Sequence, residues 1–294
     1  MLIISNKYES LDAVLNHKKL ITETKDSDLF ESRCARYLRS LFGNRKFSVK
    51  GGDDRTVSDI LVDDTFYIEC KMTENDGKRN GAQCTGFGIT QNRNKFICSN
   101  TAEDSEQAEH MLDYMNSHFS EFKKVVEPHT GTSDLFIDES IFAEYISDYY
   151  IKKNALYFIT SFEDEFVVFK NTPKNLLKYF TITATARYYQ YGTKNLPISQ
   201  RDEAERAIKK QYNVSSVKYD DNHTFVKIKD LVEDPYINDG DLHFYLSSKN
   251  QKQDEYRVMK LSNLGCARVL FLLRSKRSQD KKDLDEFRRY INSI

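Results

Sequence analysis

Hydrophobic and polar positions along the chain follow patterns that predict several helices. Apolar residues from Leu29 to Phe42 recur at the spacing of an amphipathic helix. Asp28 suits the N-cap of this helix, Glu31 completes a capping box, and Gly43 suits its end. Further helices are expected at 105–124, 139–153, 199–212 and from about residue 280 onward.

Branched and aromatic residues around a polar turn predict a β-hairpin in the first third of the chain. Its strands are expected at 58–62 and 66–72, joined by a turn at 63–65. Residues 73–94 are rich in Gly, Asn and Gln, so we expect a loop with one short strand there. Later strands are expected at 155–161, 165–170, 181–190, 224–229, 242–247, 256–261 and 267–273.

The order of these elements predicts an α/β (mixed α+β) fold with a central mixed sheet flanked by helices and a C-terminal α+β extension. Pro and Gly are scarce, so no clean linker divides the chain. We expect an N-terminal extension at 1–27, a core at 28–170 and a C-terminal region at 171–294, with a soft boundary that also allows one domain.

Composition describes a folded protein with a heavily charged surface. Of 294 residues, 39% are hydrophobic and 30% are charged, and the net charge is −1. A basic face for nucleic acid would therefore have to arise from local segregation of charge. Five cysteines form no CxxC pair, which argues against structural zinc or disulfides and favours a reducing compartment. No membrane helix or signal peptide is recognisable, so we expect a cytoplasmic protein without a membrane partner.

The predicted hairpin carries the strongest candidate chemistry. Strand side chains alternate, so Glu69 and Lys71 point to the same face. A three-residue turn would place Asp59 opposite Glu69, with Cβ atoms roughly 5 Å apart. Two carboxylates so close repel each other unless a cation lies between them, and such hard oxygen ligands suit Mg²⁺.

These positions indicate roles in phosphodiester chemistry. Asp59 and Glu69 are candidate metal ligands, and the main-chain carbonyl of Cys70 is a further one. Lys71 could place positive charge near the attacking water or the transition state. A solvent-facing edge strand would carry the same residues, so the bare pattern is weak. An acidic residue two positions before a lysine also occurs at Glu23–Lys25, Asp76–Lys78, Glu121–Lys123 and Asp280–Lys282.

A longer series of short motifs extends over most of the chain from about residue 28, in the order and approximate spacing of a known enzyme family. It runs through Phe30-Glu31, Tyr37-Leu38, Lys50-Gly51, Thr56 to Leu61, Phe66 to Met72, Gln83-Cys84, Phe87, Asn92-Arg93, Phe158 to Ser161, Arg187 and Leu261-Ser262-Asn263. This series resembles the HhaI-type type II restriction endonucleases of the PD-(D/E)XK nuclease superfamily. The resemblance implies a PD-(D/E)XK restriction-endonuclease-like core at 28–170.

The resemblance also implies an activity and assigns residues to it. The activity is Mg²⁺-dependent cleavage of double-stranded DNA at a short palindrome, GCGC in the family. Asp59, Glu69 and Lys71 match the catalytic triple, Glu31 the helical acid, and Gln83 a position after the catalytic strand. From the residues alone, Glu31 could equally be only the capping-box partner.

The chain departs from the family pattern at two places, and the resemblance also implies a partner enzyme and a mode of cutting. Ser58 stands where the superfamily name has Pro, and the segment between Met72 and Gln83 is longer than in the family. A restriction enzyme implies a protective DNA methyltransferase in the same cell. A palindromic target suits either a homodimer or a monomer that nicks each strand in turn.

A polar segment around Gly192 follows a predicted strand and is a candidate reader of bases. Guanine offers O6 and N7 to Arg or Lys in the major groove. We expect DNA contacts from Arg187, Lys194, Asn195 and Gln200, which would make 171–294 a DNA-recognition region. An ordinary hairpin loop would have the same composition.

Two other functions remain open from the sequence. One is a structure-selective PD-(D/E)XK nuclease of repair or recombination, which would ignore sequence when it cuts. The other is a non-catalytic DNA-binding module on the same scaffold, because a fold does not guarantee an activity.

Overall fold

The computed structural model describes most of the chain and divides it into two compact units. The described residues are 27–50, 57–73, 81–99, 108–188, 193–220, 222–248, 254–261 and 265–294. Unit 1 comprises the described residues within Met1–Gly86, Leu135–Ala184 and Leu270–Ile294, and unit 2 those within Phe87–Asp134 and Thr185–Val269. The N-terminal extension expected at 1–27 lies outside the described residues except for Ser27.

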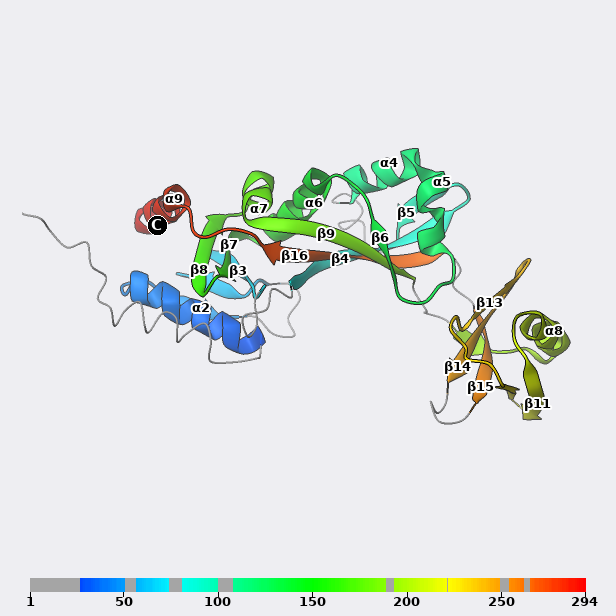
Figure 1. Ribbon diagram of the computed structural model, residues 1–294. Helices are drawn as coiled ribbons and strands as arrows, with labels where there is room; N and C mark the ends of the chain where they lie inside the picture. Colours follow the sequence, from blue (N-terminus) through cyan, green and yellow to red (C-terminus); the bar gives the residue numbers. More distant parts are fainter. Residues whose placement is uncertain are drawn as a thin grey trace, which may run out of the picture. The chain divides into compact units, whose positions relative to one another are not determined.

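A five-stranded mixed sheet in unit 1 contains the predicted hairpin (Figure 1). The strands follow the order β1-β2-β3-β7-β8, and only the β3–β7 pair within this sheet is parallel. Their bounds are β1 Phe47–Val49, β2 Ile60–Val62, β3 Phe66–Lys71, β7 Ala155–Phe162 and β8 Glu165–Lys170. The predicted central mixed sheet is therefore confirmed.

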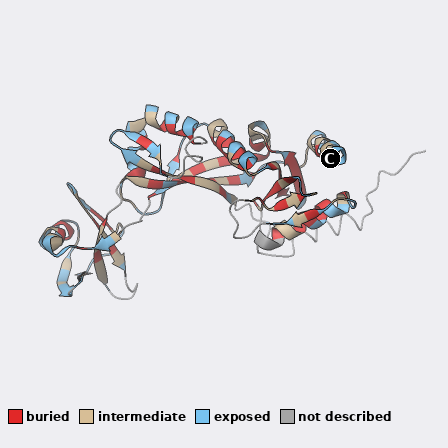
Figure 2. Ribbon diagram, turned by 180° about the vertical axis from the view of Figure 1, so that it is seen from behind, coloured by how far each residue is buried: buried red, intermediate tan, exposed pale blue. Residues whose placement is uncertain are grey.

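Helices α2 and α9 share one hydrophobic core with this sheet. Along α2, Phe30, Cys34 and Leu38 recur at helical spacing and are buried. Phe287 and Ile291 of α9 are buried in the same cluster. In Figure 2 the helices alternate between buried positions (red) and exposed positions (pale blue). The helices of unit 1 are α2 Ser27–Leu41, α6 Glu139–Lys152, α7 Pro173–Tyr179 and α9 Lys281–Ser293.

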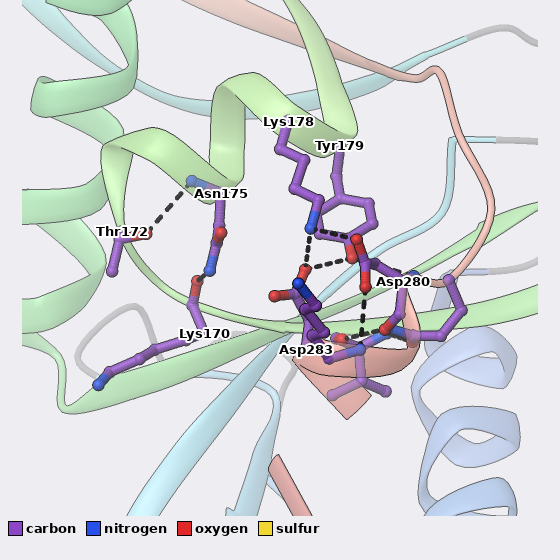
Figure 3. A network of polar contacts seen from close by, with 10 residues as sticks. Lys170, Thr172, Asn175, Lys178, Tyr179, Asp280 and Asp283 are labelled. Carbon is purple, nitrogen blue, oxygen red and sulfur yellow. Dashed lines mark hydrogen bonds and ion pairs between the residues drawn. The ribbon is translucent and has the colours of Figure 1, made fainter. Parts of the chain in front are cut away.

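Helix α9 begins in a network of charges that joins it to α7 (Figure 3). Lys178 Nζ lies 2.8 Å from a carboxylate oxygen of Asp280 and 2.8 Å from one of Asp283. The Tyr179 hydroxyl donates a hydrogen bond to Asp283. Asp280 also caps α9 by accepting a 2.9 Å hydrogen bond from the Lys282 amide. This helix was predicted from about residue 280, and it begins at Lys281 because Asp280 caps its N-terminus.

A second five-stranded sheet has the order β5-β4-β16-β9-β6, and the residues of β4, β6, β9 and β16 are divided between the two units. The long β4 replaces the loop expected at 73–94, of which 74–80 lie outside the described residues. Phe87 and Ile89 alternate along the strand and are buried, as is Cys84, but Gly86 and Gly88 obscured this pattern. The bounds are β4 Ala82–Asn92, β5 Lys95–Cys98, β6 Thr132–Leu135, β9 Phe180–Tyr188 and β16 Cys266–Ser275.

Unit 2 also contains a six-stranded antiparallel sheet with its own hydrophobic core. The order is β11-β12-β15-β14-β13, and β10 pairs with β15. Its core joins Ala204 and Ile208 of α8 to Val226, Phe244 and Val258 of the sheet. The bounds are β10 Thr193–Asn195, η2 Ile198–Gln200, α8 Arg201–Gln211, β11 Val214–Asp220, β12 His223–Ile228, β13 Tyr236–Asp239, β14 Leu242–Ser248 and β15 Glu255–Leu261.

The helix expected at 105–124 is shorter and interrupted. It consists of α4 Glu109–Ser117, α5 Phe119–Phe122 and the 3₁₀ helix η1 Lys123–Val126. Residues 101–107 lie outside the described residues. Among the helices that the structure describes, none is long and apolar enough to cross a membrane.

The compact units differ from the division expected near residue 170. Each unit is assembled from separate segments, and 270–294 groups with unit 1. The physical reason is α9, whose Phe287 packs edge-on against Phe42 and Tyr157 of the first core. A chain end that supplies part of a core belongs with that core, and local composition does not reveal this.

Candidate active site

The β2–β3 hairpin has the register that the sequence predicted. Val62 pairs with Phe66, which leaves residues 63–65 as the turn. Asp63 and Asp64 have φ angles of 44° and 56°, in the left-handed region that Asp tolerates better than most residues. The turn therefore has the residue types that its backbone requires.

This register brings the three predicted catalytic side chains together. Extended by one residue, the pairing places Asp59 across from Glu69. Asp59 Oδ2 accepts a 2.6 Å hydrogen bond from the Cys70 amide, which fixes the carboxylate against β3. Lys71 Nζ donates a 2.5 Å hydrogen bond to Glu69 Oε1. The two carboxylates and the ammonium thus form one cluster.

The cluster is buried, and its electrostatics are unbalanced. Glu69 is only 4% exposed. Burial and the charge of Glu69 raise the pKa of Asp59 to about 8, and Glu31 adds to the increase. Lys71 and the Cys70 amide act in the opposite direction without cancelling it. Asp59 is therefore a carboxyl group that lacks sufficient positive charge around it.

Lys71 remains an ammonium in this environment. Burial disfavours its charge, but Glu69 and Asp59 outweigh burial and raise the pKa of Lys71 above its usual range. A permanent positive charge next to two carboxylates is what a role in stabilising a phosphate transition state requires.

The donor set fits a hard divalent cation. One oxygen of Asp59 accepts from the Cys70 amide, and one oxygen of Glu69 accepts from Lys71. Among the described residues no other donor contacts these two carboxyl groups. The structure brings together no group of three His, Cys, Asp or Glu side chains for a metal in its described part. Water and phosphate oxygens would have to complete the coordination, as Mg²⁺ commonly allows. The Cys70 carbonyl stays a predicted third protein ligand.

Tyr150 of α6 and Cys84 of β4 lie beside Lys71. Lys71 Nζ is 5.3 Å from the centroid of the Tyr150 ring. The Cys84 thiol donates to the Tyr150 hydroxyl over 3.6 Å. Tyr150 was not predicted as a site residue, because nothing in the sequence distinguishes it from other buried tyrosines of its helix. Cys84 was noted only within the resemblance.

Three buried hydroxyl groups hold the end of β3 after Lys71. Thr160 of β7 donates a 2.6 Å hydrogen bond to the main-chain carbonyl of Lys71. Thr73 and Ser275 hydrogen-bond to each other, and each lies within 3.2 Å of the Thr160 hydroxyl. The backbone position of Lys71 is therefore fixed from β7 and β16.

Of the two remaining predicted site residues, Glu31 lies near Asp59, whereas Gln83 is exposed on β4. Glu31 of α2 is close enough to Asp59 to raise its pKa. Helix α2 already includes Ser27 and Asp28, so Asp28 is not the N-cap that was expected. Gln83 is exposed on β4, and strand alternation directs it away from the face on which Cys84 meets Tyr150. Its catalytic role stays a prediction.

The four expected DNA-binding residues all lie in unit 2. Arg187 is exposed at the end of β9. Lys194 and Asn195 belong to β10, so part of the expected loop is a strand that pairs with β15. Asn195 accepts a hydrogen bond from Arg257, which no sequence pattern indicated. Gln200 lies in η2, and residues 189–192 of the expected loop are outside the described residues.

The mixed sheet and the Asp59, Glu69 and Lys71 cluster together define a restriction-endonuclease-like nuclease fold. Among solved structures, HhaI endonuclease in complex with DNA is similar to this chain at 28% sequence identity and a TM-score of 0.55. The similarity covers 92% of this chain and 98% of that one. The fold is therefore HhaI-like, which confirms the predicted resemblance and fold class. Sequence comparisons match no family model and no curated protein.

Proposed function

We propose that this chain is a type II restriction endonuclease that hydrolyses phosphodiester bonds of double-stranded DNA at a specific site with Mg²⁺. The observation that carries the proposal is the buried Asp59, Glu69 and Lys71 cluster within an HhaI-like fold. The similar structure is an endonuclease solved with DNA, which supports DNA as the substrate.

The residues of the cluster have distinct proposed roles. Asp59 and Glu69 would hold the metal, which when bound polarises the scissile phosphate and lowers the pKa of a bound water. Lys71 supplies fixed positive charge to the attacking water and the pentavalent phosphate. Glu31 adds negative charge beside Asp59 and could orient a water.

We further propose the family's specificity for this chain. The site would be GCGC, read by Arg187, Lys194, Asn195 and Gln200 through the donors and acceptors of the major groove. A DNA methyltransferase in the same cell would protect the host, and the enzyme would act as a homodimer or as a monomer that cuts the strands in turn.

Digestion of a sequenced, unmethylated plasmid tests the proposal directly. Purified protein is incubated with and without Mg²⁺, and the ends of the fragments are mapped. Discrete Mg²⁺-dependent fragments ending at GCGC are expected. Discrete fragments at another sequence would keep the enzyme class and reject GCGC. Cleavage that follows DNA structure, or no cleavage, would reject a restriction endonuclease.

The reader residues need a separate experiment. Arg187→Ala is expected to weaken discrimination between GCGC and sites that differ by one base pair, because a bidentate contact to guanine contributes roughly 1–3 kcal/mol. Arg288→Ala, on the exposed side of α9, is the control. Unchanged discrimination in the Arg187 variant would remove this residue from the reader.

A further inference from the structure

The aromatic ring of Tyr150 is a feature of the site that the proposed metal chemistry does not use. Tyr150 lies near the end of α6 and is 5% exposed. Its ring centroid is 5.3 Å from Lys71 Nζ. A cation within about 6 Å of a ring centroid is attracted by the negative face of the ring, and more strongly when water is excluded.

The ring is held firmly by its neighbours. Its centroid is 5.0 Å from that of Tyr149 and 5.2 Å from that of Phe158, both nearly perpendicular to it. Cys84 donates to the hydroxyl at the far end of the ring. Burial and the nearby Cys84 and Glu69 raise the pKa of Tyr150 well above its usual value. The side chain is thus a rigid and neutral phenol.

A neutral ring can hold the Lys71 ammonium in place when Glu69 also binds a metal. Lys71 is bonded to Glu69 Oε1, but Glu69 is also a proposed metal ligand. A carboxylate that binds a cation holds a neighbouring ammonium less strongly, because part of its charge is already neutralised. The ring of Tyr150 cannot bind Mg²⁺, so its attraction for Lys71 does not compete with the metal.

We propose that Tyr150 is a positioning residue whose aromatic face keeps the Lys71 ammonium at the Asp59–Glu69 cluster while Glu69 serves the metal. The inference rests on the proposed nuclease function for its effect on rate. The contact between the ring and the ammonium stands independently of that function.

The chain provides a matched control for this contact. Lys178 Nζ is also 5.3 Å from the ring centroid of its neighbour Tyr179. Tyr179 is 1% exposed, so its truncation removes a comparable buried ring. It belongs to the α7–α9 network and not to the hairpin.

Single-turnover cleavage of saturating DNA separates a positioning role from a packing role. Tyr150→Phe keeps the ring, so its rate should stay within about twofold of wild type. Tyr150→Leu should be about 10- to 30-fold slower, with its DNA affinity in Ca²⁺ unchanged. Tyr179→Leu should lose thermal stability but keep its rate. Equal rates for Tyr150→Leu and Tyr150→Phe would overturn the proposal.

A fluorinated series applies the test even if Tyr150→Leu does not fold. Residue 150 is replaced by phenylalanine and then by phenylalanines with increasing numbers of ring fluorines. Fluorine preserves the shape of the ring but weakens its negative face. The rate should fall along the series while the melting temperature stays nearly constant. A flat rate would show that only packing matters.

Nuclear magnetic resonance provides a readout that does not depend on activity. The ring current of Tyr150 should shift the Lys71 ε-methylene signal, and Tyr150→Leu should return it toward the random-coil value. If wild-type protein fails to cut DNA, the proposed function is rejected, and this shift still tests the contact. A Lys71 signal that is identical in both proteins overturns the contact itself.

Discussion

Two clusters in unit 1 contain the same kinds of side chain but satisfy their charges differently. Each has two carboxylates, one lysine and one tyrosine, and in each the ammonium lies 5.3 Å from the ring centroid. The proposed catalytic cluster, called the catalytic cluster below, comprises Asp59, Glu69, Lys71 and Tyr150. The α7–α9 cluster comprises Asp280, Asp283, Lys178 and Tyr179.

The position of the lysine distinguishes them. In the α7–α9 cluster Lys178 contacts both carboxylates, and its hydrogen bond lowers the pKa of Asp280. In the catalytic cluster Lys71 is bonded to Glu69, and burial raises the pKa of Asp59 to about 8. The first arrangement is electrostatically complete, whereas the second lacks positive charge. A buried deficit of this kind is typical of a functional site, and residue composition alone does not reveal it.

The largest expected effect is on cleavage by the catalytic cluster. Lys71→Ala and Asp59→Ala should each slow single-turnover cleavage by about 10²- to 10³-fold or more, because in the proposed function Lys71 supplies charge to the transition state and Asp59 holds the metal. Lys178→Met, which removes the corresponding lysine of the other cluster, should cleave at nearly the wild-type rate.

The controls for this comparison are Asp64, in the turn of the hairpin, and its ion-pair partner Lys46, which precedes β1. Asp64→Asn and Lys46→Ala remove an exposed ion pair beside the turn and should leave the rate unchanged. Binding to DNA in Ca²⁺ should persist in all variants. Cleavage by Lys71→Ala at a rate close to wild type would show that the assigned site is wrong.

The two clusters should also respond oppositely to pH. Asp59 has its pKa raised from 3.8 to about 8, so the folded protein without metal keeps a proton that the unfolded chain releases. Its contribution to stability is present below about pH 4 and is lost as the pH rises to about 8. Asp280 has a lowered pKa, so its contribution is present above about pH 4 and is lost on acidification.

Urea unfolding in EDTA between about pH 5 and about pH 8 measures the difference. The free energy of unfolding of wild type should fall with rising pH by at most about 1.4 kcal/mol per unit, and Asp59→Asn should flatten this slope. An identical slope in Asp59→Asn would show that the raised pKa of Asp59 does not cause the pH dependence of stability.

Mg²⁺ should supply the positive charge that the surroundings of Asp59 lack, and its binding should therefore stabilise the fold. Mg²⁺ at about 100 times its dissociation constant would raise the free energy of unfolding by about 2.7 kcal/mol. The increase should be larger at high pH, where Asp59 is ionised, and absent in Asp59→Asn. Thermal unfolding with Mg²⁺ and with EDTA measures it, and Lys178→Met serves as a variant that keeps the effect. An equal increase in Asp59→Asn would place the metal elsewhere.

The hairpin could be predicted from sequence because its signals are local. Branched and aromatic residues flank the polar turn at 63–65, and the turn length sets the register. That register alone places Asp59 opposite Glu69. Strands β7 and β8 were confirmed for a similar local reason, since each is a nearly continuous apolar run beside a short polar turn. Helix α6 was also confirmed.

The remaining features depend on contacts between distant segments. Strand β4 contains glycines that disfavour a strand, and it forms because neighbouring strands complete its hydrogen bonds. Tyr150 meets Lys71 only after α6 has folded against β3 and β7, so no periodicity indicates it. The grouping of α9 with unit 1 likewise depends on Phe287 and Ile291 reaching a core formed mostly by earlier residues.

A smaller effect should follow from changes in the α7–α9 cluster. Lys178→Met keeps most of the aliphatic stem but leaves Asp283 without its cation. The side chains of Lys178 and Asp283 are 24% and 14% exposed, so solvent replaces part of the interaction. We expect the free energy of unfolding to fall by about 1 kcal/mol. A variant as stable as wild type would mean that the network contributes nothing to holding α9.

The smallest difference concerns the two tyrosine hydroxyls. Tyr179→Phe removes a hydrogen bond to Asp283 and should lower the free energy of unfolding by about 1 kcal/mol. Tyr150→Phe removes only a weak contact with the Cys84 thiol and should change it by less than about 0.5 kcal/mol. Parallel urea titrations of both variants measure the contrast. If Tyr150→Phe were the more destabilised, its hydroxyl would carry the interaction here assigned to its ring.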